Sequence, residues 1–242
     1  MCLIVYKPEG RTFDRDIIET GMFGNSDGWG LMYVKNGKIV VKKSTVMDSL
    51  FTTLDKIDES AQAMSLHLRY ATHGPVVTEN CHPFVSPSKE FAMMHNGVIS
   101  KMNIKGSESD TRAYCRDVAW DVLDKMGYES GVDFLEASDD SGSRFAYVNR
   151  AGRFMLAGKW IDRDGLKYSN AGGFWSTKKL DLRGLTSHYE PQDLIEMSDM
   201  THTEIVKLCR DQPDYVAMLI SDYLGCYVAE DYLDDPIDVD AF

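Results

Sequence analysis

The sequence has no long hydrophobic run, no excess of positive charge and no paired cysteines. No uninterrupted apolar stretch approaches the roughly 18–20 residues of a transmembrane helix. The first residues, MCLIVYKPEG, lack the basic flank and long apolar core of a secretory signal peptide. We therefore expect a cytoplasmic protein that does not associate with a membrane.

Acidic residues outnumber basic residues in this sequence. The chain has 26 Lys and Arg against 38 Asp and Glu, and its formal net charge is −12. This charge argues against a nucleic-acid backbone or an anionic membrane as the main partner. The hydrophobic fraction of 43% over 242 residues is enough for a substantial core.

The five cysteines are few, odd in number and scattered, at Cys2, Cys81, Cys115, Cys209 and Cys226. There is no CxxC pair, so neither a disulfide framework nor a zinc ribbon is indicated. Cys81 and His82 are neighbours, but adjacent residues rarely offer convergent metal ligands and no second pair matches them. We predict no metal and no cofactor.

Apolar periodicity predicts the elements, because strands alternate and helices repeat every 3.6 residues. The predicted strands are residues 2–6, 28–33, 39–42, 63–69, 91–94, 145–148, 154–156 and 166–175, the last lying against the hairpin before it. The predicted helices are residues 47–57, 109–126, 191–197, 201–210 and 213–224. Asn36-Gly37 suits a type I′ turn, where both residues need positive φ. Strands around central helices indicate an α+β layered architecture.

Cys2 follows the initiator methionine directly. If Met1 is removed, one residue carries a thiol nucleophile and an α-amine with a pKa of about 7.7–8.0. That amine can act as a general base near neutral pH, so nucleophile and base arrive together. Cysteine is small enough for ordinary methionine removal. The arrangement matters only if the rest of the chain builds a site around it.

Three further motifs contain groups suited to binding an amino acid, and each also has a purely structural interpretation. Arg69 ends a predicted strand and could bind a carboxylate at two points, or pair with a surface acid. Asn96-Gly97 could offer two donors to an oxyanion, or form a plain turn. Asp110 could hold an ammonium group, or simply cap the helix together with Ser109.

Together the motifs resemble the class II glutamine amidotransferase domain of the N-terminal-nucleophile hydrolases, over about residues 2–180. The matching segments are Cys2, Asn25–Gly30, His67–Gly74, Asn80–Phe84, His95–Gly97 and Ser109–Thr111. The resemblance implies a four-layer αββα sandwich of two mainly antiparallel sheets. It also implies hydrolysis of the glutamine side-chain amide through a Cys2 thioester, with Cys2 as nucleophile and its freed amine as base.

The resemblance also implies roles for the other motif residues. Arg69 would bind the glutamine α-carboxylate with help from Thr72 and His73, Asn96 and Gly97 would form the oxyanion hole, and Asp110 would hold the α-ammonium group. Tyr70 stands where many members have tryptophan, and keeps an aromatic wall. His82 would support the site, while Gly28 and Trp29 would be scaffold near the cysteine.

The sequence shows no ammonia-accepting domain, and no P-loop for nucleotide activation. We therefore expect a synthetase subunit to accept the ammonia, or hydrolysis of a γ-glutamyl peptide for its own sake. A non-catalytic binding module on the same fold is the remaining alternative.

The chain after about residue 180 differs in character. Residues 181–229 read as a helical extension, which could dock a partner, form a homo-oligomer or cover one sheet face. Residues 230–240 contain six acidic residues and no basic one, so 230–242 is predicted to be a solvated acidic tail rather than a docking segment for a basic surface.

Overall fold

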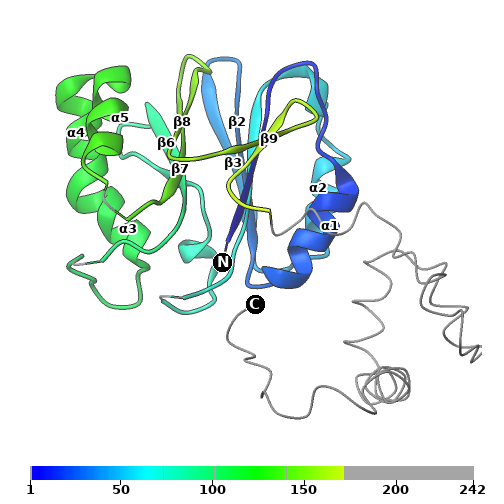
Figure 1. The fold of residues 1–242 in the computed structure, drawn as a ribbon, viewed down its shortest axis with the longest axis horizontal. Helices are drawn as coiled ribbons and strands as arrows, with labels where there is room; N and C mark the ends of the chain where they lie inside the picture. Colours follow the sequence, from blue (N-terminus) through cyan, green and yellow to red (C-terminus); the bar gives the residue numbers. More distant parts are fainter. Residues whose placement is uncertain (1, 73, 101, 140, 172–242) are drawn as a thin grey trace, which may run out of the picture. The chain divides into compact units, whose positions relative to one another are not determined.

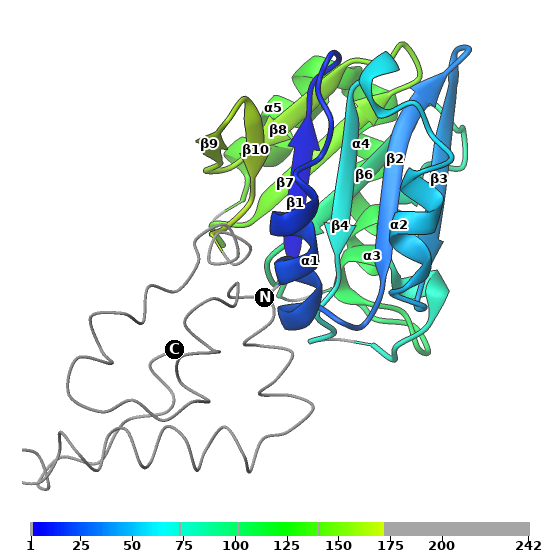
Figure 2. The same ribbon diagram turned by 90° about the vertical axis from the view of Figure 1, so that its right-hand side faces the viewer.

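A computed structural model describes residues 2–171, except residues 73, 101 and 140. Its strands form two antiparallel sheets, one in the order β3-β2-β4-β1-β10-β9 and the other in the order β5-β6-β7-β8 (Figures 1 and 2). The bounds are β1 Leu3–Lys7, β2 Trp29–Lys35, β3 Lys38–Ser44, β4 Met64–Leu68, β5 Phe84–Val85, β6 Phe91–Asn96, β7 Arg144–Asn149, β8 Phe154–Ala157, β9 Ile161–Arg163 and β10 Leu166–Tyr168.

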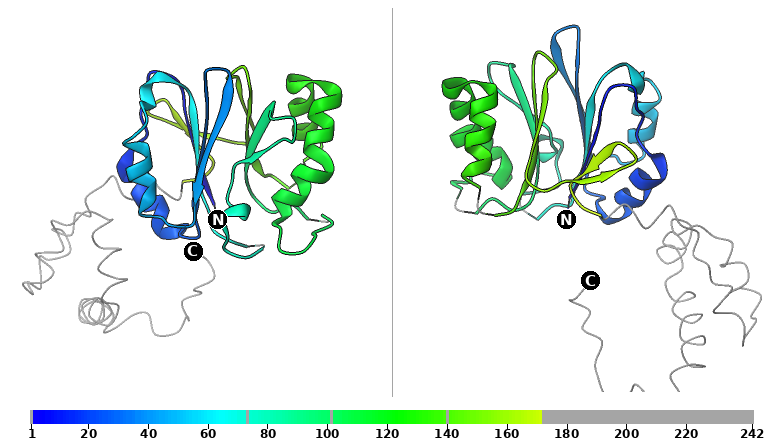
Figure 3. Two further views of the ribbon diagram at one scale, coloured as in Figure 1. Left: turned by 180° about the vertical axis from the view of Figure 1, so that it is seen from behind. Right: turned by 45° about the horizontal axis from the view of Figure 1, so that its top comes forward.

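Helices cover the outer face of each sheet (Figures 1 and 3). They are α1 Arg15–Gly24, α2 Ser49–Leu54, α3 Asp110–Tyr114, the π-helix η3 Cys115–Ala119, α4 Trp120–Met126 and α5 Tyr128–Ala137, with short 3₁₀ turns η1 Glu59–Ala61 and η2 Thr78–Asn80. Buried apolar residues form three clusters: under α1 and α2, between the sheets, and under α3 to α5. The predicted αββα sandwich is confirmed.

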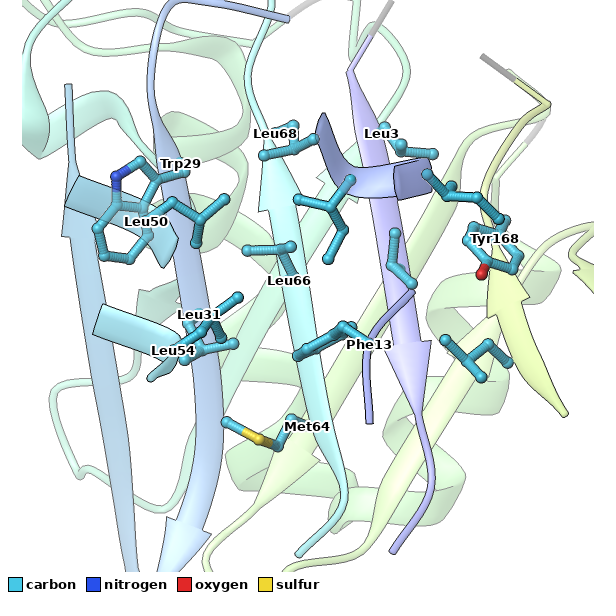
Figure 4. Close-up of a cluster of buried hydrophobic side chains, with 14 of the residues drawn as sticks. Leu3, Phe13, Trp29, Leu31, Leu50, Leu54, Met64, Leu66, Leu68 and Tyr168 are labelled. Atoms are coloured by element: carbon cyan, nitrogen blue, oxygen red, sulfur yellow. The ribbon is translucent and has the colours of Figure 1, made fainter. Parts of the chain in front are cut away.

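The alternation of side chains along the strands explains these layers. In β1, Leu3 and Val5 join the cluster beneath α1 and α2, whereas Ile4 joins the cluster between the sheets. Figure 4 shows Leu3 on β1 and Leu66 on β4 within the first of these clusters. Each fully buried leucine contributes about 1.5–3 kcal/mol relative to an exposed one. The fold is therefore held by one apolar layer on each side of each sheet.

Local signals predicted several boundaries correctly. The hairpin of β2 and β3 turns at Asn36 and Gly37, whose φ values are 53° and 66°. Ser109 caps the helix that begins at Asp110, and its hydroxyl accepts the backbone N–H of Arg112. The predicted helix at 109–126 corresponds to α3, η3 and α4, which follow one another without a gap.

One strand prediction is wrong in its placement. The stretch beginning at residue 166 does not lie against the β7–β8 hairpin; β10 pairs with β1, with Val5 opposite Tyr168, and with β9. Leu166 and Tyr168, two residues apart, both point into the apolar cluster beneath α1 and α2. Burial of these two side chains therefore favours pairing of β10 with the first sheet. The structure also contains α1, α5 and β9, which the sequence analysis missed.

The predicted helices at 191–197, 201–210 and 213–224, the extension 181–229, and the tail 230–242 lie outside the described residues. They remain predictions, as does the domain boundary at 180. In the part of the chain that the structure describes, no helix has the length and apolar character needed to cross a bilayer.

Candidate active site

Strand pairing brings Cys2 and Arg69 together, although 67 positions separate them in the sequence. β1 and β4 are antiparallel with Leu3 opposite Leu68, so the residue before one strand lies beside the residue after the other. The site is therefore a product of strand register rather than of any local motif.

The Cys2 thiol is held by the main chain of Tyr70. The Tyr70 N–H donates to Cys2 Sγ at 3.3 Å, and the thiol lies 3.4 Å from the Tyr70 carbonyl. Burial raises the pKa of the Cys2 thiol, and the hydrogen bond to Tyr70 partly offsets this. The thiol is therefore protonated near neutral pH, and attack on a substrate needs a base to remove its proton.

Arg69 is buried at the end of β4, with 4% of its surface exposed. Its guanidinium donates to the carbonyls of Pro75 at 3.2 Å and Gly74 at 3.4 Å. The loop that follows is fixed by Asp27, whose carboxylate accepts the N–H of Ala71 at 2.7 Å. A buried guanidinium in a loop held this firmly is suited to binding a carboxylate.

Asp110 supplies the negative charge of the site. It is 7% exposed, and its carboxylate accepts the N–H groups of Ile99 at 2.9 Å and Thr111 at 2.8 Å. Asn80 fixes the segment that leads into α3. Its side-chain N–H donates to the Ser107 carbonyl, and its side-chain oxygen accepts the N–H of Ser109. The carboxylate is thus oriented by main-chain donors, as the binding of an ammonium group requires.

Asn96 and Gly97 end β6, and the two have different surroundings. The Asn96 amide donates to Ser169 Oγ at 2.8 Å, and the same hydroxyl accepts the N–H of Ile4. Gly97 has a φ of 154°, and a β-carbon there would overlap the Ser143 hydroxyl. Any side chain at this position would therefore displace its neighbours.

These groups surround one narrow cavity of about 20 Å³. It is lined by Cys2, Arg69, Tyr70, Ala71, Thr72, Asn80, His82, His95, Gly97, Ser109, Asp110 and Thr111. Seven predicted site residues are thereby brought together: Cys2, Arg69, Tyr70, Thr72, His82, Gly97 and Asp110.

The other predicted site residues do not line this cavity or are not among the residues that the structure describes. Asn96 does not line the cavity, Gly28 approaches Cys81, and the Trp29 indole donates to the Val46 carbonyl beside α2. His73 lies outside the described residues. Among residues 2–171 that the structure describes, no group of three His, Cys, Asp or Glu side chains could hold a metal ion.

Three buried histidines support the strand that carries Asn96. The His95 N–H donates to Nδ1 of His82 at 3.3 Å, and His67 Nε2 donates to the His95 carbonyl at 3.2 Å. Burial lowers the pKa of His67 to about 3, that of His95 to about 4, and that of His82 well below its usual value. The rings are therefore neutral at pH 7, as an acceptor at His82 Nδ1 requires.

Sequence reasoning missed two residues beyond β10. Ser169 binds both Ile4 and Asn96, and Asn170 donates its amide to the Cys2 carbonyl at 2.6 Å. A Ser-Asn pair inside the predicted strand at 166–175 was the available signal. Its meaning depends on β10 lying beside β1.

The chain is similar to known proteins over part of its length. The family model described as "Glutamine amidotransferases class-II" matches residues 15–112. Glutamine–fructose-6-phosphate aminotransferase (isomerizing) of Aquifex aeolicus is 38% identical over 74 residues, which are 30% of this chain and 12% of the relative. The enzyme of that name from Streptococcus pyogenes is 28% identical over 137 residues, 50% of this chain and 22% of the relative. Residues 15–112 thus match a class II glutamine amidotransferase domain.

The solved structures place this class II domain in a known fold. Glutamine phosphoribosylpyrophosphate amidotransferase from B. subtilis superposes with a TM-score of 0.51 at 15% sequence identity, over 72% of this chain and 43% of that one. At this identity the likeness concerns the fold alone. The alignments with the two curated relatives span only 12% and 22% of their length, so the chain matches a minor part of each.

Proposed function

We propose that the class II domain hydrolyses the side-chain amide of glutamine to glutamate and ammonia through a thioester on Cys2. The observation that carries this proposal is the shared cavity: the Cys2 thiol, the Arg69 guanidinium and the Asp110 carboxylate all line it. A guanidinium and a carboxylate at one cavity complement the two charged ends of a free amino acid.

The reaction proceeds in two steps. After loss of Met1, the α-amine of Cys2 takes the thiol proton and the sulfur attacks the amide carbon. The oxyanion is stabilised by Asn96 and Gly97, and ammonia leaves with a proton returned by the amine. Water then attacks the γ-glutamyl thioester, which releases glutamate and restores the thiol.

The ammonia is passed to an acceptor outside residues 2–171, carried on a separate subunit. The relatives' names describe transfer to fructose 6-phosphate and an amidotransferase of phosphoribosylpyrophosphate, so acceptor chemistry varies on this fold. Co-purification of a stoichiometric synthetase that raises glutaminase turnover would identify the acceptor.

The test is covalent trapping of the purified full chain with a glutamine-analogue electrophile, followed by peptide mass spectrometry. We expect one adduct on Cys2, protection by glutamine, and glutamate release in a parallel assay of untreated protein. Intact-mass measurement checks that Met1 is absent. Hydrolysis of γ-glutamyl peptides at a higher kcat/KM than glutamine would overturn the substrate, and an unlabelled Cys2 would overturn the nucleophile.

A further inference from the structure

The ring of His95 is held on both sides. Its Nδ1 lies 2.9 Å from Thr111 Oγ1, and its Nε2 lies 2.9 Å from Ser143 Oγ. The side chain is buried, and it stacks on the Phe145 ring with 4.7 Å between centroids. This ring is next in sequence to Asn96, yet the reaction as described gives it no role.

The Thr111 side of the ring leads to the charged group proposed to bind the ammonium end of glutamine. The Thr111 N–H donates to Asp110 Oδ1 at 2.8 Å, and its hydroxyl lies 3.4 Å from the same oxygen. At 3.4 Å the hydroxyl contact is much the longer of the two. The Thr111 hydroxyl has a single hydrogen, so it can donate to the carboxylate or to the His95 ring but not to both at once.

The Ser143 side leads to Gly97 and then to the protein surface. A β-carbon on Gly97 would overlap Ser143 Oγ and lie 2.8 Å from His95 Nε2, so the glycine packs directly against this hydrogen bond. Ser143 Oγ is 2.7 Å from Ser141 Oγ, which donates to Asp139 at 2.6 Å.

The number of available hydrogens fixes the direction of each bond. Ser141 donates to the Asp139 carboxylate, so Ser143 must donate to Ser141 and accept from His95 Nε2–H. A neutral imidazole has one N–H, so His95 Nδ1 is then an acceptor and the Thr111 hydroxyl donates to it. Asp110 Oδ1 is then held by the Thr111 main-chain N–H at 2.8 Å, and not by the hydroxyl. Burial lowers the pKa of His95 to about 4, in agreement with a neutral ring.

We propose that His95 is a positioning residue, held as the neutral Nε2–H tautomer. It fixes the Thr111 side chain, and so the main-chain N–H that orients the Asp110 carboxylate, and it orients the Gly97 main chain through Ser143. This inference rests on the proposed function for the roles of Asp110 and Gly97. We call the contact of the His95 ring with Thr111 the Thr111 arm, and its contact with Ser143 the Ser143 arm. The two arms act on different stages of the reaction. The Thr111 arm acts on glutamine binding, and the Ser143 arm acts on stabilisation of the oxyanion.

Two single variants separate the arms by their kinetics. One hydrogen bond is worth about 0.5–1.5 kcal/mol, or roughly 2- to 10-fold. We expect Thr111→Val to raise KM for glutamine by about that factor with little change in kcat. We expect Ser143→Ala to lower kcat by about that factor with little change in KM. Thr53→Val and Ser138→Ala, whose hydroxyls bond to carbonyls within α2 and at the end of α5, are the matched controls.

A spectroscopic measurement tests the hydrogen-bond direction without enzyme activity. In ¹⁵N NMR of the full chain at pH 7, His95 should carry its proton on Nε2, and in Ser143→Ala the proton should move to Nδ1, where Thr111 can accept it. A purely structural role would change neither the tautomer nor the division between KM and kcat. An Nδ1–H tautomer in the wild type, or parallel losses in both variants, would overturn the proposal. Absence of glutaminase activity in the wild type refutes the proposed function instead.

Discussion

A polar side chain lies at each end of β1, and the two serve different purposes. At one end Cys2 contacts the Tyr70 main chain and lines a cavity shared with Arg69 and Asp110. At the other end Lys7 is fully buried, and its ammonium group donates to the carbonyls of Glu59 and Gln62.

The difference lies in where the partners come from. The Lys7 ammonium is satisfied by two carbonyls of the chain itself, so that end of the strand is structurally complete. At the Cys2 end, a thiol faces a guanidinium and a carboxylate around a cavity. A buried polar group whose partners are supplied by the protein stabilises the fold, whereas one beside a cavity with complementary charges can act on a ligand.

The largest effect is expected at the Cys2 end. Cys2→Ala should abolish glutaminase activity, because no other group can form the thioester, while the unfolding free energy changes by under about 1 kcal/mol. Glutamate release and urea denaturation measure the two quantities. Cys115→Ala, in the layer beneath α3 to α5, is the control that should keep kcat. Near-normal turnover in Cys2→Ala would remove the functional half of the comparison.

Asn96→Ala should lower kcat by about 10²–10³-fold, as loss of one oxyanion donor does. Ser169→Ala deletes the hydrogen bond from the Asn96 amide to Ser169 but leaves that amide in place, and should cost under about 10-fold. Steady-state kinetics on both variants compares them. Equal losses would mean that Asn96 only holds the β10 segment against β6.

Lys7→Met should act on stability and leave catalysis intact. The methionine keeps the apolar stem but leaves the Glu59 and Gln62 carbonyls without their donor, at about 1–3 kcal/mol each. Urea denaturation should show this loss, and kcat per folded molecule should match the wild type. Lys38→Met, at the exposed start of β3, is the control with no expected loss. A fall in kcat without loss of stability would contradict a structural role for this end.

The last prediction concerns the pH dependence of stability. Burial lowers the folded-state pKa of His67 to about 3 and of His95 to about 4, and the pKa of His82 also falls. Below the unfolded-state pKa of about 6.5 the unfolded chain binds more protons than the folded protein. The free energy of unfolding therefore decreases as the pH is lowered. The loss is up to about 1.4 kcal/mol per pH unit for each histidine, and it continues toward the folded pKa values.

Urea denaturation at pH 7.5, 6 and 5 measures this slope. His82→Gln should reduce it by one histidine's share, because the buried ring that resists protonation is gone. A free energy of unfolding that is constant between pH 7 and pH 5 would show that these rings are not held neutral by burial.

Much of the framework follows from local signals. The apolar run at the start of β1, the alternation in Met64–Leu68, the Asn36-Gly37 turn and the Ser109 cap follow from side-chain pattern and backbone preference, and each was predictable. The candidate residues Cys2, Arg69 and Asp110 were also identifiable, because their chemistry is evident from residue type. α1 was missed although Asp14 caps its first turn, since its apolar residues are few.

The amino-acid sequence by itself determined which chemical groups are present and which short segments are strands and helices. Tertiary structure alone decided which groups meet: β10 pairs with β1, so Ser169 reaches Ile4 across 165 positions and Asn170 reaches Cys2 across 168. The physical reason is that strand partners are chosen by the burial of whole faces. Tyr168 must enter the apolar layer beneath α1, and Ser169, as the next residue, is thereby turned toward the site.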